Sequence, residues 1–122
     1  MGNWQDVSGA GVGSGVGGGW RNLSITAGAV TPVAAAEETQ AVTLTGNITV
    51  NAPSGSPAAG DHLCLMFTQD ATGGRTLTWN SAYKLGTIGT VLADASTYST
   101  FRFVYTGSAW RLTALPAIGL PV

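Results

Sequence analysis

The sequence predicts an all-β protein, because three segments of this 122-residue chain carry strand and turn patterns. Residues 101–114 alternate around Gly107-Ser108, which fits a two-residue hairpin loop with glycine where a positive φ is needed. Residues 41–51 alternate mainly between apolar and threonine side chains, as a half-buried strand does. Residues 63–69 are apolar on both faces in their first half, which is typical of a central strand.

The loop at Gly107 also sets the register of the C-terminal hairpin. Its apolar pairs are Tyr105 with Trp110, Phe103 with Leu112, and Phe101 with Ala114. On the other face, Val104 opposes Arg111 and Arg102 opposes Thr113. A hairpin with such an aromatic face is not stable alone and must pack on more sheet. We therefore predict a structural core that includes Phe101, Phe103, Tyr105, Trp110, Leu112 and Trp79.

Before residue 60 the sequence indicates one short strand, one short helix and one long strand. Residues 22–27 alternate as a strand, and Thr31-Pro32 can begin a helix of about two turns that runs through Glu38. A hairpin at Gly46-Asn47 would mix the two faces of residues 41–51. We therefore interpret this segment as one strand, with one face made by Val42, Leu44, Gly46, Ile48 and Val50.

After residue 60 the chain alternates strands with turns. The strand at residues 63–69 ends in a turn at residues 70–74, which returns the chain as residues 75–79 with Leu77 and Trp79 inward. Residues 80–100 carry apolar positions among turn residues and lead into the hairpin. Residues 115–122 are apolar and broken by prolines, so they form either a frayed tail or a strap on a neighbour.

The N-terminal residues differ from the rest in composition. Residues 8–19 are mostly glycine and cannot build a core of their own, while Trp4 and Trp20 bracket them. One interpretation is a flexible tail. The other is an arm whose tryptophans anchor it on a partner, because glycine lets backbones approach closely. We therefore divide the chain into an arm, residues 1–21, and a β-module, residues 22–122.

Composition excludes several classes of function. Charged residues make up 9% of the chain, against roughly 25% in an ordinary soluble domain, so we expect copies or partners to cover part of the surface. A net charge of −1 argues against nucleic-acid binding. No apolar run reaches membrane-spanning length, and the first residues lack the features of a signal peptide. We expect a chain made in a cytoplasm, or assembled into something built there.

No pattern in the sequence indicates catalysis, a metal or a cofactor. Residues 13–18 spell a dinucleotide-binding pattern but lack the strand and helix that such a site needs. The single cysteine, Cys64, lies in an apolar strand and is expected to be a buried, inert thiol. We place Cys64 and the only histidine, His62, on opposite faces of their strand, which weakens a metal or catalytic pairing. We therefore predict that the protein is not an enzyme.

The remaining polar and aromatic candidates have structural interpretations. Asp61, Asp70 and Asp94 stand where turns are expected, and Glu37-Glu38 lies in a solvated segment, so paired catalytic carboxylates are disfavoured. Three aromatic residues could form a sugar-stacking platform: Trp79, Trp110 and Tyr83. For the two tryptophans, however, packing in the core is favoured.

Four segments together resemble a β-structured module of bacteriophage virion proteins. They are residues 41–50, residues 60–61, residues 67–79 and residues 104–110, and the run from Gln69 to Trp79 is the most specific part. The module resembles those of phage tail fibres, head fibres and capsid decoration proteins. The resemblance implies a small antiparallel β-sandwich or jelly-roll-like unit that assembles as a homotrimer on the virion surface. It carries over no catalytic residue.

Within this class we expect a capsid decoration protein, which cements or covers the phage head, because the chain offers one module and a glycine-rich arm. Its partners would be other copies of itself and the major capsid protein, with Trp4 and Trp20 as the arm's anchors. The alternative is a short tail-fibre or adhesin component that binds host surface carbohydrate and contacts tail or fibre proteins. Either would sit on the virion surface after assembly in the bacterial cytoplasm.

Overall fold

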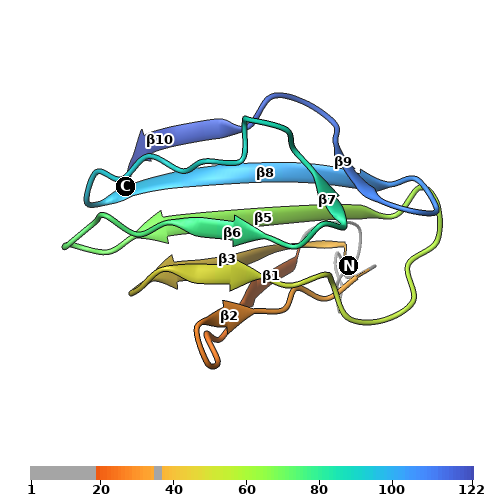
Figure 1. The fold of residues 1–122 in the computed structure, drawn as a ribbon, viewed down its shortest axis with the longest axis horizontal. Coiled ribbons are helices and arrows are strands. Elements are labelled where there is room, and N and C mark those ends of the chain that lie inside the picture. The colour runs from red at the N-terminus through yellow and green to blue at the C-terminus, as the bar shows by residue number, and fades with distance from the viewer. Residues whose placement is uncertain (1–18, 35–36) are drawn as a thin grey trace, which may run out of the picture.

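The computed structural model describes residues 19–34 and 37–122, and these residues form strands and no helix (Figure 1). The all-β prediction is therefore confirmed. None of the described residues belongs to a helix that could span a membrane. The strands are β1 (Gly19–Asn22), β2 (Ala29–Val30), β3 (Glu38–Leu44), β4 (Ile48–Val50), β5 (His62–Gln69), β6 (Leu77–Trp79), β7 (Tyr83–Lys84), β8 (Thr97–Tyr105), β9 (Trp110–Leu112) and β10 (Ala117–Pro121).

The strands form two sheets, and the first six alternate between them. The large sheet has the order β1-β3-β5-β8-β9-β7, with β10 also paired to β8, and the small sheet has the order β2-β4-β6. From β1 to β6 every pairing within a sheet is parallel. The chain thus winds in successive coils, each giving one strand to each sheet. We call residues 19–79 the coil region.

Antiparallel pairing between the named strands always involves β8, near the C-terminal end of the chain. Strand β8 pairs antiparallel with β5, β9 and β10, and we call residues 97–121 the hairpin region. The predicted antiparallel architecture is therefore wrong for the coil region. Parallel neighbours need a crossover connection, and here each crossover passes through the other sheet instead of a tight turn.

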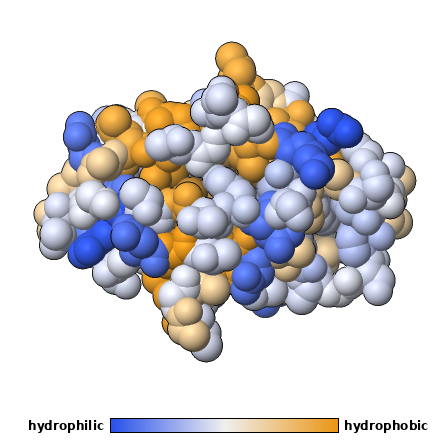
Figure 2. Space-filling model, viewed as in Figure 1, coloured by the Kyte–Doolittle hydropathy of each residue, from blue (hydrophilic) through white to orange (hydrophobic). Residues whose placement is uncertain are grey.

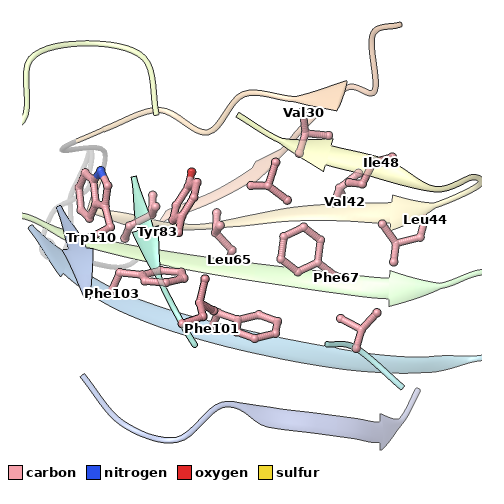
Figure 3. Packing of buried hydrophobic residues seen from close by; sticks show 14 residues of the cluster. Val30, Val42, Leu44, Ile48, Leu65, Phe67, Tyr83, Phe101, Phe103 and Trp110 are labelled. Atoms are coloured by element: carbon pink, nitrogen blue, oxygen red, sulfur yellow. The ribbon is translucent and has the colours of Figure 1, made fainter. Parts of the chain in front are cut away.

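The core lies between the two sheets, where both contribute buried side chains. Figure 3 shows Val30 and Ile48 of the small sheet pointing toward the same interior as Leu65 and Phe67 of the large sheet. Phe101, Phe103 and Trp110 are buried in this core, while Tyr105, Leu112 and Trp79 are partly buried and pack against it. Edge-to-face contacts join Trp79 to Phe67 and Phe101, with ring centroids 5.6 and 5.0 Å apart.

The hairpin register follows the prediction except at its open end. Phe103 lies opposite Leu112 and Tyr105 opposite Trp110, and Gly107 has a φ of 101°. Ala114, however, does not pair with Phe101, because β9 ends at Leu112 and β10 takes over the edge of β8. The C-terminal segment is therefore neither a frayed tail nor a strap on a neighbour.

The segment from residue 41 to residue 51 has the predicted faces but is not one strand. Val42, Leu44, Ile48 and Val50 are all buried, yet β3 ends at Leu44 and β4 begins at Ile48 in the other sheet. Between them a bend turns the chain, and the Asn47 side chain accepts a hydrogen bond from the Thr76 backbone at 3.0 Å. Buried positions alternate across this corner just as they would along one continuous strand, so the sequence pattern does not reveal the corner.

Two predictions for residues 22–38 are wrong. In place of the helix, Val33 forms a parallel bridge with Ser54, and Glu38 is the first residue of β3. Residues 35–36 of the predicted helix lie outside the described residues. The buried Gln40 amide bonds both the N–H and the C=O of Val33, at 2.7 and 2.8 Å. In place of the strand at residues 22–27, β1 covers Gly19–Asn22. The boundary drawn between arm and module therefore falls inside a strand.

The turn after β5 is a corner between sheets. Strand β5 is central, between β3 and β8, as predicted, but β6 returns in the small sheet and pairs in parallel with β4. The buried Gln69 amide fixes this corner: Nε2 donates to the carbonyls of Arg75 and Leu92, and Oε1 accepts from the Arg75 N–H. Satisfying these backbone groups away from water stabilises the corner.

Candidate functional site

The outer face of the large sheet carries one row of side chains drawn from four strands. The register places Trp20 of β1 beside Thr39 of β3, Thr39 beside Cys64 of β5, and Cys64 beside Arg102 of β8. Directly paired residues point to the same face, and the opposite face holds the buried core. This row therefore points away from the small sheet.

A cleft of about 330 Å³ opens along this row, at the small end of the size range of ligand sites. Three neighbouring strands, the segment before β3 and the segment after β9 contribute to it, so it is built from parts of the chain that are distant in sequence. Its lining residues are Glu37, Glu38, Thr39, His62, Leu63, Cys64, Arg102, Phe103 and Thr113.

His62 and Cys64 both line this cleft, so the prediction that they face opposite ways is wrong. They stand two positions apart on β5, and side chains two apart on a strand share a face. Cys64 is also not fully buried: it is partly buried, with the Thr39 hydroxyl 3.9 Å from its Sγ. Among the described residues, no three or more His, Cys, Asp and Glu side chains group as metal ligands.

The cleft combines carboxylates, hydroxyls, an imidazole and a guanidinium. Glu38 forms an ion pair with Arg21, whereas Glu37 is exposed at a φ of 54°, a left-handed conformation. Thr39 and Thr113 supply hydroxyls that both donate and accept hydrogen bonds, and the Arg102 guanidinium only donates. Such a mixture suits a ligand rich in hydroxyl groups.

An exposed indole stands at the end of this row. Trp20 is 58% exposed, and its Nε1 donates to the Asn22 side chain at 3.0 Å, which holds the ring on the outer face. A large, exposed and oriented aromatic ring offers an apolar surface for stacking. The other predicted anchor, Trp4, lies outside the described residues.

The other residues that the sequence offered as candidates lie in the core or in turns. Trp79, Tyr83 and Trp110 belong to the core or pack on it, so they form no exposed platform. Burial raises the pKa of the Tyr83 hydroxyl, which donates to the Asn51 carbonyl at 2.8 Å. The turn aspartates behave as expected for turn residues; Asp61 accepts from the Ala58 N–H at 2.8 Å, and Asp70 accepts from Thr72 and Gly73.

The sequence patterns did not predict that these cleft residues lie together. The spacing of His62 and Cys64 was the one available signal, because residues two apart on a strand share a face, although we predicted the opposite. Their neighbours depend on the pairing of β5 with β3 and β8. Arg102 was assigned only to the polar face of a hairpin, and Glu37 only to a solvated segment. These residues lie close together because of the order in which the strands pair in the sheet.

With this geometry in view, the comparison with known families identifies the class of protein. The family described as "Putative phage tail fibre C-terminal domain" matches residues 28–110, which run from just before β2 to the first residue of β9. The chain is thus a structural protein of the phage virion surface. It belongs to this tail-fibre family, since the match covers more than half of its length. No curated protein matches the chain.

This family membership changes the functional interpretation. The expected capsid decoration protein gains no support from it, whereas the tail-fibre alternative fits the match directly. The resemblance to virion modules that the sequence showed, with its run from Gln69 to Trp79, is confirmed.

Proposed function

We propose that this chain is a non-enzymatic tail-fibre module that binds host surface carbohydrate at the outer-face cleft. The observation that carries the proposal is the alignment of exposed Trp20 with a cleft of hydrogen-bonding side chains in one row. Family membership supports the tail-fibre context. The two sheets then act as a small β-sandwich-like support for the face that contacts the host.

The chemistry of the cleft fits a sugar. A sugar ring presents hydroxyl groups around its edge and C–H groups on its faces, so it needs polar partners and a flat apolar surface together. Glu37, Thr39 and His62 supply donors and acceptors, and the Trp20 indole supplies the flat surface. Because backbone pairing of the strands holds Trp20, Thr39 and His62 in place, little ordering of these three is required on binding.

The proposal includes a homotrimer, which a second surface supports. Large apolar side chains remain exposed along the edge strand β10 and beside it, where Figure 2 shows apolar residues gathering along the upper side. Leu115 is 84% and Val122 78% exposed, and Leu92, Ile118 and Leu120 are exposed to a lesser degree. Such an apolar edge is normally covered.

The backbone of β10 disfavours strand addition by a partner. Pro116 immediately before the strand and Pro121 at its last position lack N–H groups, and Gly119 has a φ of 68° at an irregularity in its pairing with β8. Other copies would therefore cover this surface through side-chain packing. Light scattering at micromolar concentration should report a trimer that Leu115→Ser with Val122→Ser weakens; a monomeric wild-type chain would contradict it.

The carbohydrate proposal is tested with polysaccharide extracted from the envelope of bacteria to which virions carrying this chain adsorb. Binding of the full chain is measured by calorimetry. We expect Trp20→Ala to weaken binding at least tenfold, because the stacking surface is lost. Thr43→Ala, on the same face of β3 but outside the cleft, is the matched control and should bind as the wild type does. Absent wild-type binding, or equal binding by Trp20→Ala, would overturn the proposal.

A further inference from the structure

Three of the five basic residues of this chain meet on neighbouring strands at one end of the outer face. Lys84 of β7 is directly opposite Arg111 of β9, and Arg111 is directly opposite Val104 of β8. Arg102 stands two positions before Val104 and shares its face. All three basic side chains are exposed. We call Lys84, Arg102 and Arg111 the basic stripe.

The basic stripe lacks acidic partners among the described residues. The other two basic residues are each paired, Arg21 with Glu38 and Arg75 with Asp70. Within residues 19–34 and 37–122, the stripe residues form no salt bridge. Like charges directly opposite each other on a sheet are destabilising, and Lys84 beside Arg111 is such a pair. A bound anion would relieve this repulsion.

Protection of a sheet edge explains only part of the stripe. Strand β7 is at the edge of the large sheet, and lysine on an edge strand discourages association with another sheet. That accounts for Lys84. Arg111, however, lies on β9 between β7 and β8, and Arg102 lies on β8, so neither belongs to this edge. In a chain with a net charge of −1, their grouping calls for another explanation.

The stripe is continuous with the cleft. Arg102 lines the cleft and ends the row that begins at Trp20, three strand spacings or about 14 Å away. From Arg102 the basic surface continues to Arg111 and Lys84 across the next two strands. At the opposite side, Glu37 would repel an anion. A charged ligand would therefore be oriented, with its acidic group at the stripe and its rings toward Trp20.

From this arrangement we propose that the saccharide bound by this module is anionic, with carboxylate or phosphate groups held by Lys84, Arg102 and Arg111. The inference rests on the proposed carbohydrate function and specifies its ligand class. Arginine forms paired hydrogen bonds to planar carboxylates and to phosphates, and lysine adds a flexible positive charge. The ligand lies across the strands, from the indole to the basic stripe.

The test compares chemically matched forms of the envelope polysaccharide used above. One sample is native, one has its carboxylates reduced to alcohols, and one has its phosphates removed. Calorimetry with the full chain should show at least tenfold weaker binding to one modified form, which identifies the anionic group. Raising the salt concentration should weaken binding of the native form, because exposed charges are screened.

Variants assign that preference to the stripe. Arg111→Gln combined with Lys84→Gln should weaken binding of the native form at least tenfold and remove its advantage over the weaker-binding modified form. Ala71→Glu combined with Thr72→Glu controls for net charge, since the two added carboxylates change it by as much as the double variant does, at the exposed turn after the other end of β5. It should bind as the wild type does. Circular dichroism checks that each variant is folded.

The outcomes separate the two proposals. Equal binding of all three polysaccharide forms, still lost in Trp20→Ala, would overturn the anionic ligand and leave carbohydrate binding intact. An anion preference that survives in the Arg111→Gln and Lys84→Gln variant would overturn the role of the stripe. Absence of any binding to the native polysaccharide would overturn both.

Discussion

The coil region and the hairpin region carry the same alternation of apolar and polar side chains but hold their strands in register by different means. In the hairpin region a local turn at Gly107 fixes which residues face each other. In the coil region neighbouring strands are parallel, so no tight turn can set their register. Side-chain amides that bond the backbone of distant segments do so instead: Gln40 within β3, Asn47 at the corner before β4, and Gln69 at the end of β5.

These two ways of fixing register predict which substitutions destabilise each region. The hairpin region should depend most on its aromatic face, because its turn is local and its pairs are self-aligned. The coil region should depend on buried amides and on close backbone contacts at its corners. Substitutions in the two regions test this contrast.

The largest loss is expected from the aromatic face of the hairpin region. Trp110→Ala removes a buried side chain that contacts Tyr105 with ring centroids 4.9 Å apart, and should cost about 3–5 kcal/mol of unfolding free energy. Arg102→Ala, exposed on the opposite face, should cost about 0.5 kcal/mol or less. Urea denaturation measures both. Equal losses would contradict the hairpin register.

Substituting either of two adjacent glycines tests how closely the backbone packs at the corner after β5. Gly73 and Gly74 both have positive φ, 71° and 77°, so alanine at either should cost about 1–2 kcal/mol in backbone strain. At Gly73 an added Cβ would also lie 2.6 Å from the Ala93 carbonyl oxygen, whereas at Gly74 it would meet nothing within 4 Å. We therefore expect Gly73→Ala to cost about 2–4 kcal/mol in total. Thermal denaturation showing equal costs would argue against this packing.

The role of the buried amides is tested at the same corner. Gln69→Ala leaves the Arg75 N–H and the carbonyls of Arg75 and Leu92 without their partner, which should cost about 2–3 kcal/mol. Hydrogen exchange should then show faster exchange at the Arg75 amide while the amides of β9 remain protected. Unchanged exchange at Arg75 would mean that other contacts hold the corner.

The smallest effect is expected at a partly exposed carboxylate. The Arg75 hydrogen bond, aided by the N–H groups of Gly73 and Thr72, lowers the pKa of Asp70 from its usual 3.8. Its stabilisation is therefore present above pH 3.8 and is lost as the pH falls through the lower pKa of the folded state. In thermal melts between about pH 5 and about pH 2, Asp70→Asn should lose less stability than the wild type. Parallel curves would contradict this linkage.

The alternation in the sequence predicted most of the buried positions but not the assignment of strands to sheets. Val42, Leu44, Ile48 and Val50 were assigned to the core face, and all four are buried. Their division between two sheets depends on a corner at residues 45–47, whose bonding partner is Thr76. A partner 29 residues away leaves no local pattern.

Even less of the candidate site could be predicted from the sequence. His62 and Cys64 share a face because of their spacing, but Arg102 joins them through antiparallel pairing, and Thr39 joins them through a parallel crossover. Trp20 was singled out as an anchor from its position beside the glycine tract. Its place at the end of the cleft row follows from the pairing of β1 with β3.

The all-β class, the hairpin register around Gly107, and the inward faces of residues 42–50 and of the hairpin follow from the sequence alone. Those features depend on side-chain period and turn chemistry, which act over a few residues. The two-sheet winding of the coil region, the outer-face cleft and the basic stripe are seen only in the folded chain. Each requires parallel or antiparallel pairing between distant segments, and the order in which strands pair is set by how they jointly cover one core.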